Sequence, residues 1–291
     1  MRVRALVAIF LVVLIGGQAP SSAARVSRAP VILLAAGDIG DCNSDGAELT
    51  ARLIESRRGT VAAIGDTAYP KGSTSDYKNC YQPTWGRFKA RTRPALGNHE
   101  YLTANAGPYF AYFGSKAAPP GGYYSYRLGT WHILVINSNC DQIGGCEPGS
   151  KQFRWLQADL ARHPTHCTLA YWHSPRFSSG PHGSDDGMQP IWAALAKADA
   201  DVVLNGHDHL YQRFAPLDAS GQISPKRGIH EFVVGTGGGE LYQPVVEIPA
   251  SRKIISHWGV LRLKLGANRF YWRFLSTPNG KVLDSGSGSC H

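Results

Sequence analysis

The sequence is poor in charge, in cysteine and in repeats. Charged residues make up only 18% of the 291 residues, whereas hydrophobic residues make up 43%. This apolar share excludes a disordered polyelectrolyte, because it is enough to build a core. Six cysteines are too few for a small scaffold held together by disulfides, and the 33 glycines and 18 prolines follow no collagen-like repeat. A chain of this length can form one large α/β domain or two smaller ones.

Long apolar runs are absent after residue 30, but one lies at the N-terminus. Arg2 and Arg4 precede an apolar segment at 5–15, and small residues follow at 20–24. This order is typical of a secretory signal peptide. A membrane anchor is the alternative, but the segment is shorter than the roughly 20 residues that a spanning helix needs. We therefore expect a signal peptide at 1–24 and a single mature domain at 25–291, secreted to the extracellular space or the periplasm.

Export would place the six cysteines in an oxidising compartment, where an even number indicates three disulfides. Six cysteines allow many pairings, and the sequence alone leaves them open. The pairing we expect joins Cys140 to Cys146 across a small loop, Cys42 to Cys80 between two loops that follow strands, and Cys167 to Cys290 near the C-terminus.

Short apolar runs that end in glycine or turn residues predict buried strands. They occupy 31–36, 60–64, 93–96, 169–172 and 202–204. Helical periodicity lies between them at 47–54, 153–160 and 191–198, with Ser150 as a candidate N-cap. Strands that alternate with helices indicate βαβ units, an α/β fold and a largely parallel sheet.

The remaining apolar runs indicate antiparallel strands. The runs at 123–127 and 131–136 are separated by Gly129 and Thr130, which predicts a hairpin. Antiparallel strands are also expected at 231–234, 259–265 and 270–275. No linker and no shift in composition divides the chain after residue 30, so one domain with two packed sheets is the simplest architecture.

Polar clusters follow the five predicted strands of the α/β part. They are Gly37-Asp38-Ile39-Gly40, Gly65-Asp66-Thr67-Ala68-Tyr69, Gly97-Asn98-His99-Glu100, His173, and Gly206-His207-Asp208-His209. Ligands in open α/β sheets bind beyond the carboxyl ends of strands, so the clusters are expected to converge. Oxygen and imidazole donors without a thiolate suit hard or borderline metals, and they are too many for one tetrahedral zinc. The set predicts two metal ions about 3.5–4 Å apart, bridged by a carboxylate.

Each cluster alone has a simpler interpretation. A Gly-Asp pair after a strand is most often a turn or a helix cap, and a single buried histidine is more often a hydrogen-bonded core residue than a ligand. The segment with His207 and His209 is stronger evidence for a ligand site, because two histidines two residues apart can turn towards one site. The five clusters in this order favour a metal centre over five unrelated turns.

The pattern resembles the calcineurin-like metallophosphoesterases and, within them, the purple acid phosphatases. The wider superfamily usually has Asp-x-His in the first motif, but here the third position is Gly40. The purple acid phosphatases instead carry a tyrosine three residues after the second-motif aspartate, and here that residue is Tyr69. The resemblance spans Asp38 to His209. It implies two packed mixed β-sheets flanked by helices, in a four-layer α/β/β/α sandwich.

The resemblance also implies a role for each matching residue. Asp38, Tyr69 and His209 would bind a ferric ion, and Asn98, His173 and His207 would bind a divalent ion such as Zn²⁺, Mn²⁺ or Fe²⁺. Asp66 would bridge the two ions. Phenolate and carboxylate donors favour Fe³⁺, whereas neutral imidazoles and an amide suit the divalent ion, which agrees with this division.

Two further histidines are candidate catalytic residues. His99 follows the ligand Asn98 and is expected to bond a phosphate oxygen or to protonate the leaving group. His182 lies on the loop after His173, where similar enzymes carry further histidines. Some relatives have a second histidine beside it, but here that position is Gly183. Glu100 has two alternatives: it orients His99, or it is a solvated loop acid.

The expected reaction is the hydrolysis of phosphate monoesters by attack of a metal-bound hydroxide. No phosphoenzyme is expected, because no serine or cysteine has a fitting context. The alternative enzyme is a secreted phosphodiesterase or nuclease on the same scaffold, which the net charge of +9 would suit. A non-catalytic anion-binding protein is a third possibility. We expect small phosphate esters as partners, no sequence-specific nucleic acid, and no membrane anchor after cleavage of the signal peptide.

Overall fold

The computed structural model describes Met1, Val3 and residues 29–291. Apart from Met1 and Val3, the expected signal peptide at 1–24 lies outside the described residues. Within the described part, no helix combines the length and the apolar character needed to cross a bilayer.

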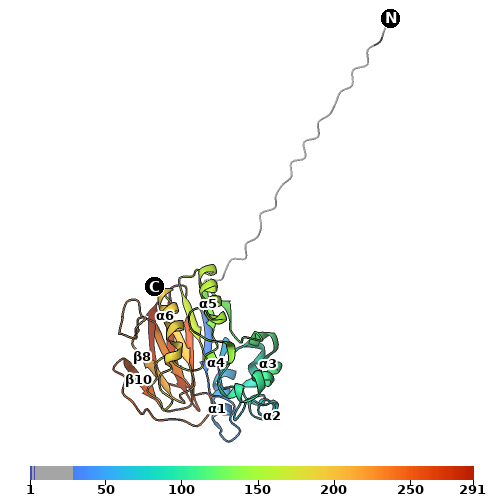
Figure 1. Ribbon diagram of the computed structural model, residues 1–291. Helices are drawn as coiled ribbons and strands as arrows, with labels where there is room; N and C mark the ends of the chain where they lie inside the picture. The colour runs from blue at the N-terminus through green and yellow to red at the C-terminus, as the bar shows by residue number, and fades with distance from the viewer. Residues whose placement is uncertain (2, 4–28) are drawn as a thin grey trace.

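Two mixed β-sheets form the centre of the fold (Figure 1). The first has the strand order β13-β12-β11-β1-β2-β3. Its strands are β1 (Val31–Ala36), β2 (Thr60–Ile64), β3 (Thr92–Ala95), β11 (Gly259–Leu265), β12 (Arg269–Ser276) and β13 (Lys281–Ser289). β1, β2 and β3 are parallel, and the other pairs in this sheet are antiparallel.

The second sheet has the order β10-β8-β9-β7-β6-β5-β4. Its strands are β4 (Tyr124–Leu128), β5 (Trp131–Val135), β6 (Thr168–Tyr171), β7 (Val202–Asn205), β8 (Tyr211–Phe214), β9 (His230–Val234) and β10 (Ser251–Ile255). β4 and β5 form the predicted hairpin, and β5, β6, β7 and β9 run parallel. The two sheets share one core, in which Leu33 and Val61 of the first sheet are clustered with Leu169 and Phe232 of the second.

Helices cover part of the outer side of each sheet. The α-helices are α1 (Gly46–Glu55), α2 (Thr74–Asp76), α3 (Gly107–Phe113), α4 (Cys140–Ile143), α5 (Lys151–Arg162) and α6 (Gln189–Lys197). The π-helical segment is η1 (Tyr77–Tyr81), and the 3₁₀-helical segments are η2 (Trp85–Arg91), η3 (His99–Leu102), η4 (Ala104–Ala106), η5 (Gly114–Ala117) and η6 (Asp186–Met188). α1 packs on the first sheet, and α5 and α6 pack on the second (Figure 1). Ser150 caps α5 as predicted, because its Oγ accepts a bond from Phe153 N (3.2 Å). The predicted α/β sandwich of two packed sheets is confirmed.

Some expectations about single strands are wrong. The strand at 231–234 was expected to be antiparallel, but β9 runs parallel to β7 and antiparallel only to β8. By contrast, β11 and β12 pair antiparallel with their neighbours, as expected for the runs at 259–265 and 270–275, and both sheets are mixed, as the resemblance implied. β8, β10 and β13 have no counterpart among the predicted strands.

The three expected disulfides are confirmed. Cys42 is bonded to Cys80, Cys140 to Cys146, and Cys167 to Cys290. The first bond ties the segment after Asp38 to η1, and the last joins the start of β6 to the end of β13. Disulfides therefore restrain both a loop beside the polar clusters and the strand that ends the first sheet.

Candidate metal centre

The polar clusters meet at the carboxyl ends of strands from both sheets. Gly37 N, at the end of β1, donates to Val234 O at the end of β9 (2.9 Å). Asp38 N donates in turn to Gly65 O (3.1 Å), which joins the first cluster to the second. Segments far apart in the sequence are thus held at one place, the position where α/β sheets bind ligands.

Asp38 and Asp66 have a left-handed backbone, with φ of 59° and 44°. A non-glycine residue adopts this conformation at a cost, and such residues gather at functional sites. Two glycines make room for the carboxylates. A Cβ at Gly206 would lie 2.6 Å from Asp38 Oδ2, and one at Gly97 would lie 2.1 Å from Asp66 Oδ1. The motifs therefore need glycine at these two positions.

The first donor group consists of Asp38, Tyr69 and His209. The Tyr69 hydroxyl lies 2.9 Å from Asp38 Oδ1 and 3.0 Å from His209 Nε2. His209 Nε2 lies 3.3 Å from the same oxygen of Asp38. His209 Nδ1 bonds to the backbone oxygen of Glu240 (2.6 Å), which places a proton on Nδ1. The lone pair of Nε2 is then free to face a cation.

The second donor group consists of Asn98, His173 and His207. His173 Nε2 lies 3.1 Å from Asn98 Oδ1, and the rings of His173 and His207 have centroids 5.0 Å apart. His173 Nδ1 bonds to the backbone oxygen of Ile64 (2.9 Å), so Nε2 again faces the cluster. Candidate ligand atoms of Asp66, His173 and His207 lie within 4.8 Å of one another.

Asp66 lies between the two donor groups. Its Oδ2 is 3.2 Å from the Tyr69 hydroxyl and 3.2 Å from His173 Nε2. One carboxylate oxygen therefore contacts a member of each group. This is the arrangement that a bridging ligand between two cations requires.

The pKa values reflect the burial of two carboxylates among histidines. Burial opposes ionisation of Asp38 and Asp66, but nearby histidines, above all His173, outweigh it and lower the pKa of both. Burial opposes the charged form of His173 too, yet Asp66 and Asp38 raise its pKa to about 10. Burial and the same carboxylates raise the pKa of Tyr69 well above its usual value. A phenolate at Tyr69 therefore requires a strong positive charge beside it.

The donor set fits two cations of different character. The first group offers a carboxylate and a potential phenolate, which are hard donors suited to a trivalent ion. The second offers an amide and imidazoles, which suit a divalent ion. Burial, together with His173, lowers the pKa of His207 to about 3, so its imidazole is neutral and able to ligate.

Glu100 fulfils neither of its two expected roles. It is fully buried, and its carboxylate accepts bonds from three backbone N–H groups, those of Asp66 (3.0 Å), Thr67 (2.7 Å) and Gly97 (2.7 Å). Burial and the carboxylate of Asp66 raise its pKa, although the donated bonds oppose this. Glu100 therefore fixes the backbone on which Asp66 stands, instead of orienting the His99 ring.

His99 lies at the rim of the centre. Its Nδ1 bonds to Pro70 O (2.6 Å), and its Nε2 lies 3.8 Å from Asp66 Oδ2. The side chain is 32% exposed, so Nε2 can meet both the cluster and a molecule from solvent. This position suits a contact with substrate, and the catalytic role of His99 stays a prediction.

His182 also lies at the centre, on the side of the second donor group. Its ring stacks on His207 with centroids 4.3 Å apart, and its backbone N donates to Asp208 Oδ1 (3.0 Å). The other oxygen of Asp208 bonds to the Ser178 hydroxyl, so this buried carboxylate holds the loop on which His182 lies. The role of His182 in catalysis stays a prediction.

Sequence reasoning missed two residues that support the centre. Asp208 was visible between His207 and His209, and its place inside that motif was the available signal. Tyr242 could not be found from the sequence, because it lies in the loop after β9 and belongs to no recognisable motif. Its ring stacks on His209 with centroids 4.2 Å apart and an interplanar angle of 6°. It also lies 5.6 Å from the His182 ring, which makes it part of the wall of the site.

Comparison with known proteins points to one family. The sequence profile described as "Calcineurin-like phosphoesterase" matches residues 24–211. Probable purple acid phosphatase 20 of Arabidopsis thaliana is 28% identical over 217 residues, covering 65% of this chain and 48% of the relative. Purple acid phosphatase 15 of the same plant is 26% identical over 250 residues, covering 73% of this chain and 46% of the relative. The chain thus spans about half the length of these curated relatives.

Solved structures show the same fold. A purple acid phosphatase from yellow lupin (Lupinus luteus) seeds superposes with a TM-score of 0.73 at 18% identity, covering 90% of this chain and 54% of its own. GAP50 of Plasmodium superposes with a TM-score of 0.71 at 16% identity, covering 90% of both chains. The family profile spans most of the chain and includes all five clusters. The chain therefore belongs to the calcineurin-like phosphoesterase family, and the relatives that it matches include purple acid phosphatases.

Proposed function

We propose that the protein hydrolyses phosphate monoesters at a centre of two metal ions. The observation that carries this proposal is the position of Asp66 Oδ2, 3.2 Å from both the Tyr69 hydroxyl and His173 Nε2. One carboxylate oxygen shared by two donor groups suits a pair of cations, as in other phosphatases with two metals. Family membership and the purple acid phosphatase relatives support the same class of reaction.

Each donor group has a proposed ion. Asp38, Tyr69 and His209 would hold Fe³⁺. Asn98, His173 and His207 would hold Zn²⁺, Mn²⁺ or Fe²⁺, and Asp66 would bridge the ions. When bound, the two cations would neutralise the phosphoryl oxygens and lower the pKa of the water that attacks phosphorus. The left-handed backbone at Asp38 and Asp66 and the bonds behind His173 and His209 hold the donors in place before any ion binds.

His99 and His182 are the proposed proton donors. His99 Nε2 lies beside Asp66, next to the first donor group, whereas His182 lies on His207 of the second. The two rings therefore flank the centre from different sides. One would bond a phosphoryl oxygen and the other would protonate the departing alcohol.

We also propose that the protein works outside the cytoplasm. Its three disulfides support this, because such bonds persist in the extracellular space or the periplasm. Small phosphate esters released by other enzymes in that compartment would be its substrates.

The proposed reaction is tested with protein reloaded with Fe³⁺ and Zn²⁺ after metal removal. Turnover of p-nitrophenyl phosphate is compared with that of bis(p-nitrophenyl) phosphate over a range of pH, and faster monoester turnover is expected. Asp66→Ala should lose both metals and activity. Asp141→Ala, which removes an exposed carboxylate on α4, is the matched control and should keep both. An Asp66→Ala variant with native turnover would falsify the bridging role.

The same assay separates the alternatives. Faster diester turnover would identify a phosphodiesterase or nuclease in place of a phosphomonoesterase. Full metal loading without turnover of either ester would indicate a non-catalytic anion-binding protein. The structural neighbour GAP50 is described as the anchor in the inner membrane complex, so the shared fold alone does not decide between catalysis and binding.

A further inference from the structure

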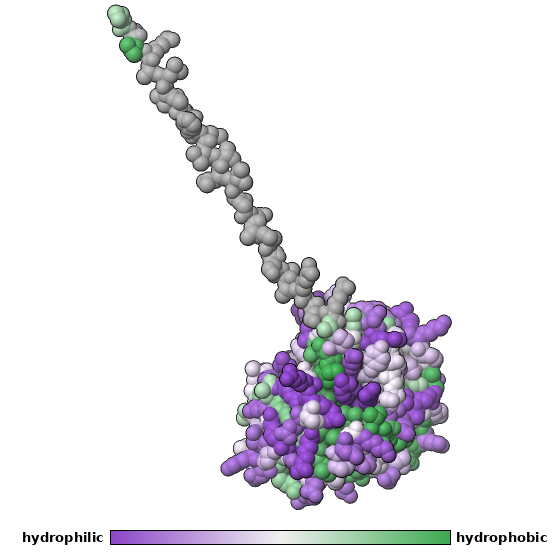
Figure 2. Space-filling model, turned by 180° about the vertical axis from the view of Figure 1, so that it is seen from behind, coloured by the Kyte–Doolittle hydropathy of each residue, from purple (hydrophilic) through white to green (hydrophobic). Residues whose placement is uncertain are grey.

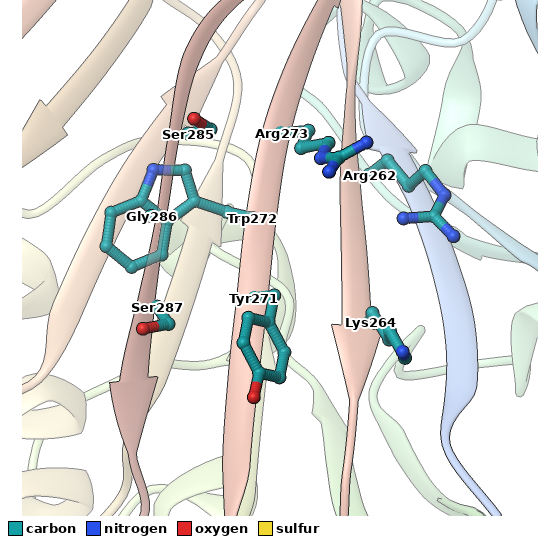
Figure 3. Close-up of a pocket in the computed structure, with 8 residues that line it drawn as sticks. All are labelled: Arg262, Lys264, Tyr271, Trp272, Arg273, Ser285, Gly286 and Ser287. Carbon is teal, nitrogen blue, oxygen red and sulfur yellow. The ribbon is translucent and has the colours of Figure 1, made fainter.

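The outer face of β11, β12 and β13 carries basic residues, one tyrosine and serines. We call this the cationic face, and it consists of Arg262, Lys264, Arg269, Tyr271, Arg273, Ser285 and Ser287. Strand alternation explains it: Phe270, Trp272 and Phe274 of β12 are buried in the core, so Arg269, Tyr271 and Arg273 point outward. Figure 3 shows Arg262, Lys264, Tyr271 and Arg273 side by side on β11 and β12, with the serines of β13 next to them.

The register of the strands places like charges opposite each other. Arg262 of β11 is paired with Arg273 of β12, and Lys264 is paired with Tyr271. Like charges directly opposite on neighbouring strands destabilise a sheet, because their side chains start only about 5 Å apart. Among the ion pairs of the described residues, none involves Arg262, Lys264, Arg269 or Arg273. The only carboxylate on β13, Asp284, is bonded to Arg213 of β8 and is thus directed to the opposite face.

The aromatic ring of Tyr271 stands in the middle of these cations. Its ring centroid is 5.9 Å from Lys264 Nζ and 5.8 Å from Arg269 Cζ. Arg269 and Arg273 lie two residues to either side on the same strand, so each starts about 7 Å from Tyr271 along β12. Tyr271 is 42% exposed, so its ring can be reached from solvent. An exposed ring framed by cations on a sheet can stack a planar group while its neighbours bind anions.

We propose that the cationic face binds single-stranded nucleic acid without sequence preference. A base would stack on Tyr271, and the phosphates on either side of it would lie on Arg269, Arg273, Arg262 and Lys264. The serine hydroxyls of β13 would donate to phosphate or sugar oxygens. Bound phosphates would remove the repulsion between Arg262 and Arg273, which no acidic side chain of the described chain removes. A single partner would therefore use both the basic side chains and the tyrosine ring of this face.

Single-stranded nucleic acid fits the cationic face better than an anionic lipid surface or an acidic polymer does. An anionic lipid surface would need apolar side chains that enter the bilayer, but the face offers serines around a single tyrosine. An acidic polymer without bases would bind the cations but would gain nothing from stacking on the exposed ring. The proposal is independent of the metal centre, because the face lies on the outer side of β11, β12 and β13, whereas the donor residues that the first sheet contributes to the centre follow β1, β2 and β3.

The test measures binding of a fluorescein-labelled oligothymidylate of about 12 nucleotides by anisotropy, with the full chain and over a range of salt. Tyr271→Ser should raise Kd by about 5- to 160-fold, the range for the loss of one stacked base. Tyr271→Phe should bind like the wild type. Arg269→Ser with Arg273→Ser should weaken binding and flatten the salt dependence by about 1.4 in log–log slope, since two phosphate contacts are lost.

A matched control removes the same charge elsewhere. Arg252→Ser with Lys253→Ser takes two cations from β10 of the second sheet and should leave Kd unchanged, which separates the face from the net charge of the protein. All of these substitutions are at exposed positions, and circular dichroism checks that each variant is folded. The proposal is overturned if Tyr271→Ser binds as tightly as Tyr271→Phe. It is also overturned if inorganic polyphosphate or phosphatidylserine vesicles show the same dependence on Tyr271 as the oligonucleotide.

Discussion

The Tyr69 hydroxyl decides which cation the first donor group can hold. Burial, Asp38 and Asp66 all disfavour its ionised form, so only a highly charged ion can stabilise a phenolate there. If that ion is Fe³⁺, the bond between phenolate and iron gives a charge-transfer band in the visible. We predict that iron-loaded protein is coloured and that Tyr69→Phe loses the band. The measurement is an absorption spectrum together with the iron content per chain.

Tyr242→Phe is the control for this prediction. It retains the ring that stacks on His209 and changes a hydroxyl outside the donor group. It should keep both the colour and the iron. If the wild-type enzyme is colourless and fully active without iron, the assignment of Fe³⁺ is wrong and the centre holds two divalent ions instead.

The buried Glu100 carboxylate sets the geometry of Asp66, and its removal should affect both stability and metal binding. In Glu100→Gln, an amide NH₂ group replaces one of the two carboxylate oxygens. In the wild type both oxygens accept bonds from backbone N–H groups, so at least one buried N–H group loses its acceptor in the variant. We expect a loss of about 1–3 kcal/mol in the free energy of unfolding. Metal affinity should fall by about 10- to 100-fold, since residues behind the ligands orient them.

Urea unfolding and metal competition measure these two effects. Glu48→Gln is the isosteric control: Glu48 is at the surface of α1, where it pairs with Arg52 and Arg87. Such exposed pairs contribute about 0–1 kcal/mol, so this variant should change stability little and metal affinity not at all. Equal effects of both variants on metal binding would contradict the role assigned to Glu100.

At the scale of elements, strands with simple apolar runs could be predicted and strands with mixed composition could not. β1, β2 and β7 are buried on both faces, and their uninterrupted apolar sequence reveals them. β13 was missed because of its Gly-Ser sequence. The structure explains those glycines: a Cβ at Gly286 would lie 2.2 Å from the Trp272 ring, and one at Gly288 would lie 2.4 Å from the Phe270 ring. The glycines make room for core aromatics of the neighbouring strand.

The direction of a strand could not be predicted from the sequence either. The run at 231–234 shows that β9 is a buried strand, but whether it runs parallel to a neighbour depends on the path of the connection before it. β8 and its loop turn the chain so that β9 aligns with β7. Local pattern therefore predicted the existence of the strand, and long-range packing determined its orientation.

β9 contains a buried acid that should make stability depend on pH. Glu231 is fully buried; its Oε1 accepts a bond from Phe177 N (3.2 Å), and its Oε2 has no hydrogen-bond partner in the described chain. Burial raises its pKa to about 8, against the effects of that bond and of Arg176. The folded state then holds a proton that the unfolded state releases near pH 4.5, so the stability contributed by Glu231 falls as pH rises towards about 8.

Glu231→Gln removes this titration. We predict that the variant gains stability relative to the wild type between about pH 5 and about pH 8, because glutamine cannot become charged in the core. Urea midpoints of both proteins at the two pH values measure the difference. Glu55→Gln, at an exposed position of α1, should show no such change. A difference between Glu231→Gln and wild type that is the same at both pH values would refute the buried titration.

At the scale of the whole molecule, the site exists because strands from both sheets end at one place. The seven candidate ligands could be selected from the sequence, since each follows an apolar run that predicts a strand end. The structure places them close together, and their role as ligands stays a prediction. Supporting residues outside these motifs could not be found. The backbone oxygen of Glu240 and the ring of Tyr242 come from a loop whose path depends on the packing of β8, β9 and β10. No local pattern marks such residues.

The disulfides should contribute to whole-molecule stability according to the length of chain that they close. Cys167–Cys290 closes a loop of 123 residues and joins the second sheet to the end of the first, whereas Cys140–Cys146 spans only 6 residues. Restriction of the unfolded chain then contributes about 5 kcal/mol for the long loop and about 2 kcal/mol for the short one. We predict that Cys167→Ser with Cys290→Ser lowers the unfolding free energy more than Cys140→Ser with Cys146→Ser.

Urea unfolding of both double variants beside the wild type measures this order. The Cys167–Cys290 bond lies at the start of β6, whereas the metal centre lies beyond the carboxyl end of that strand. Its loss should therefore leave the metal content of the folded protein unchanged, which distinguishes a global effect from damage to the centre. If the short loop proves the more stabilising, the two bonds act mainly through the native contacts around them, and restriction of the unfolded chain contributes less than those contacts.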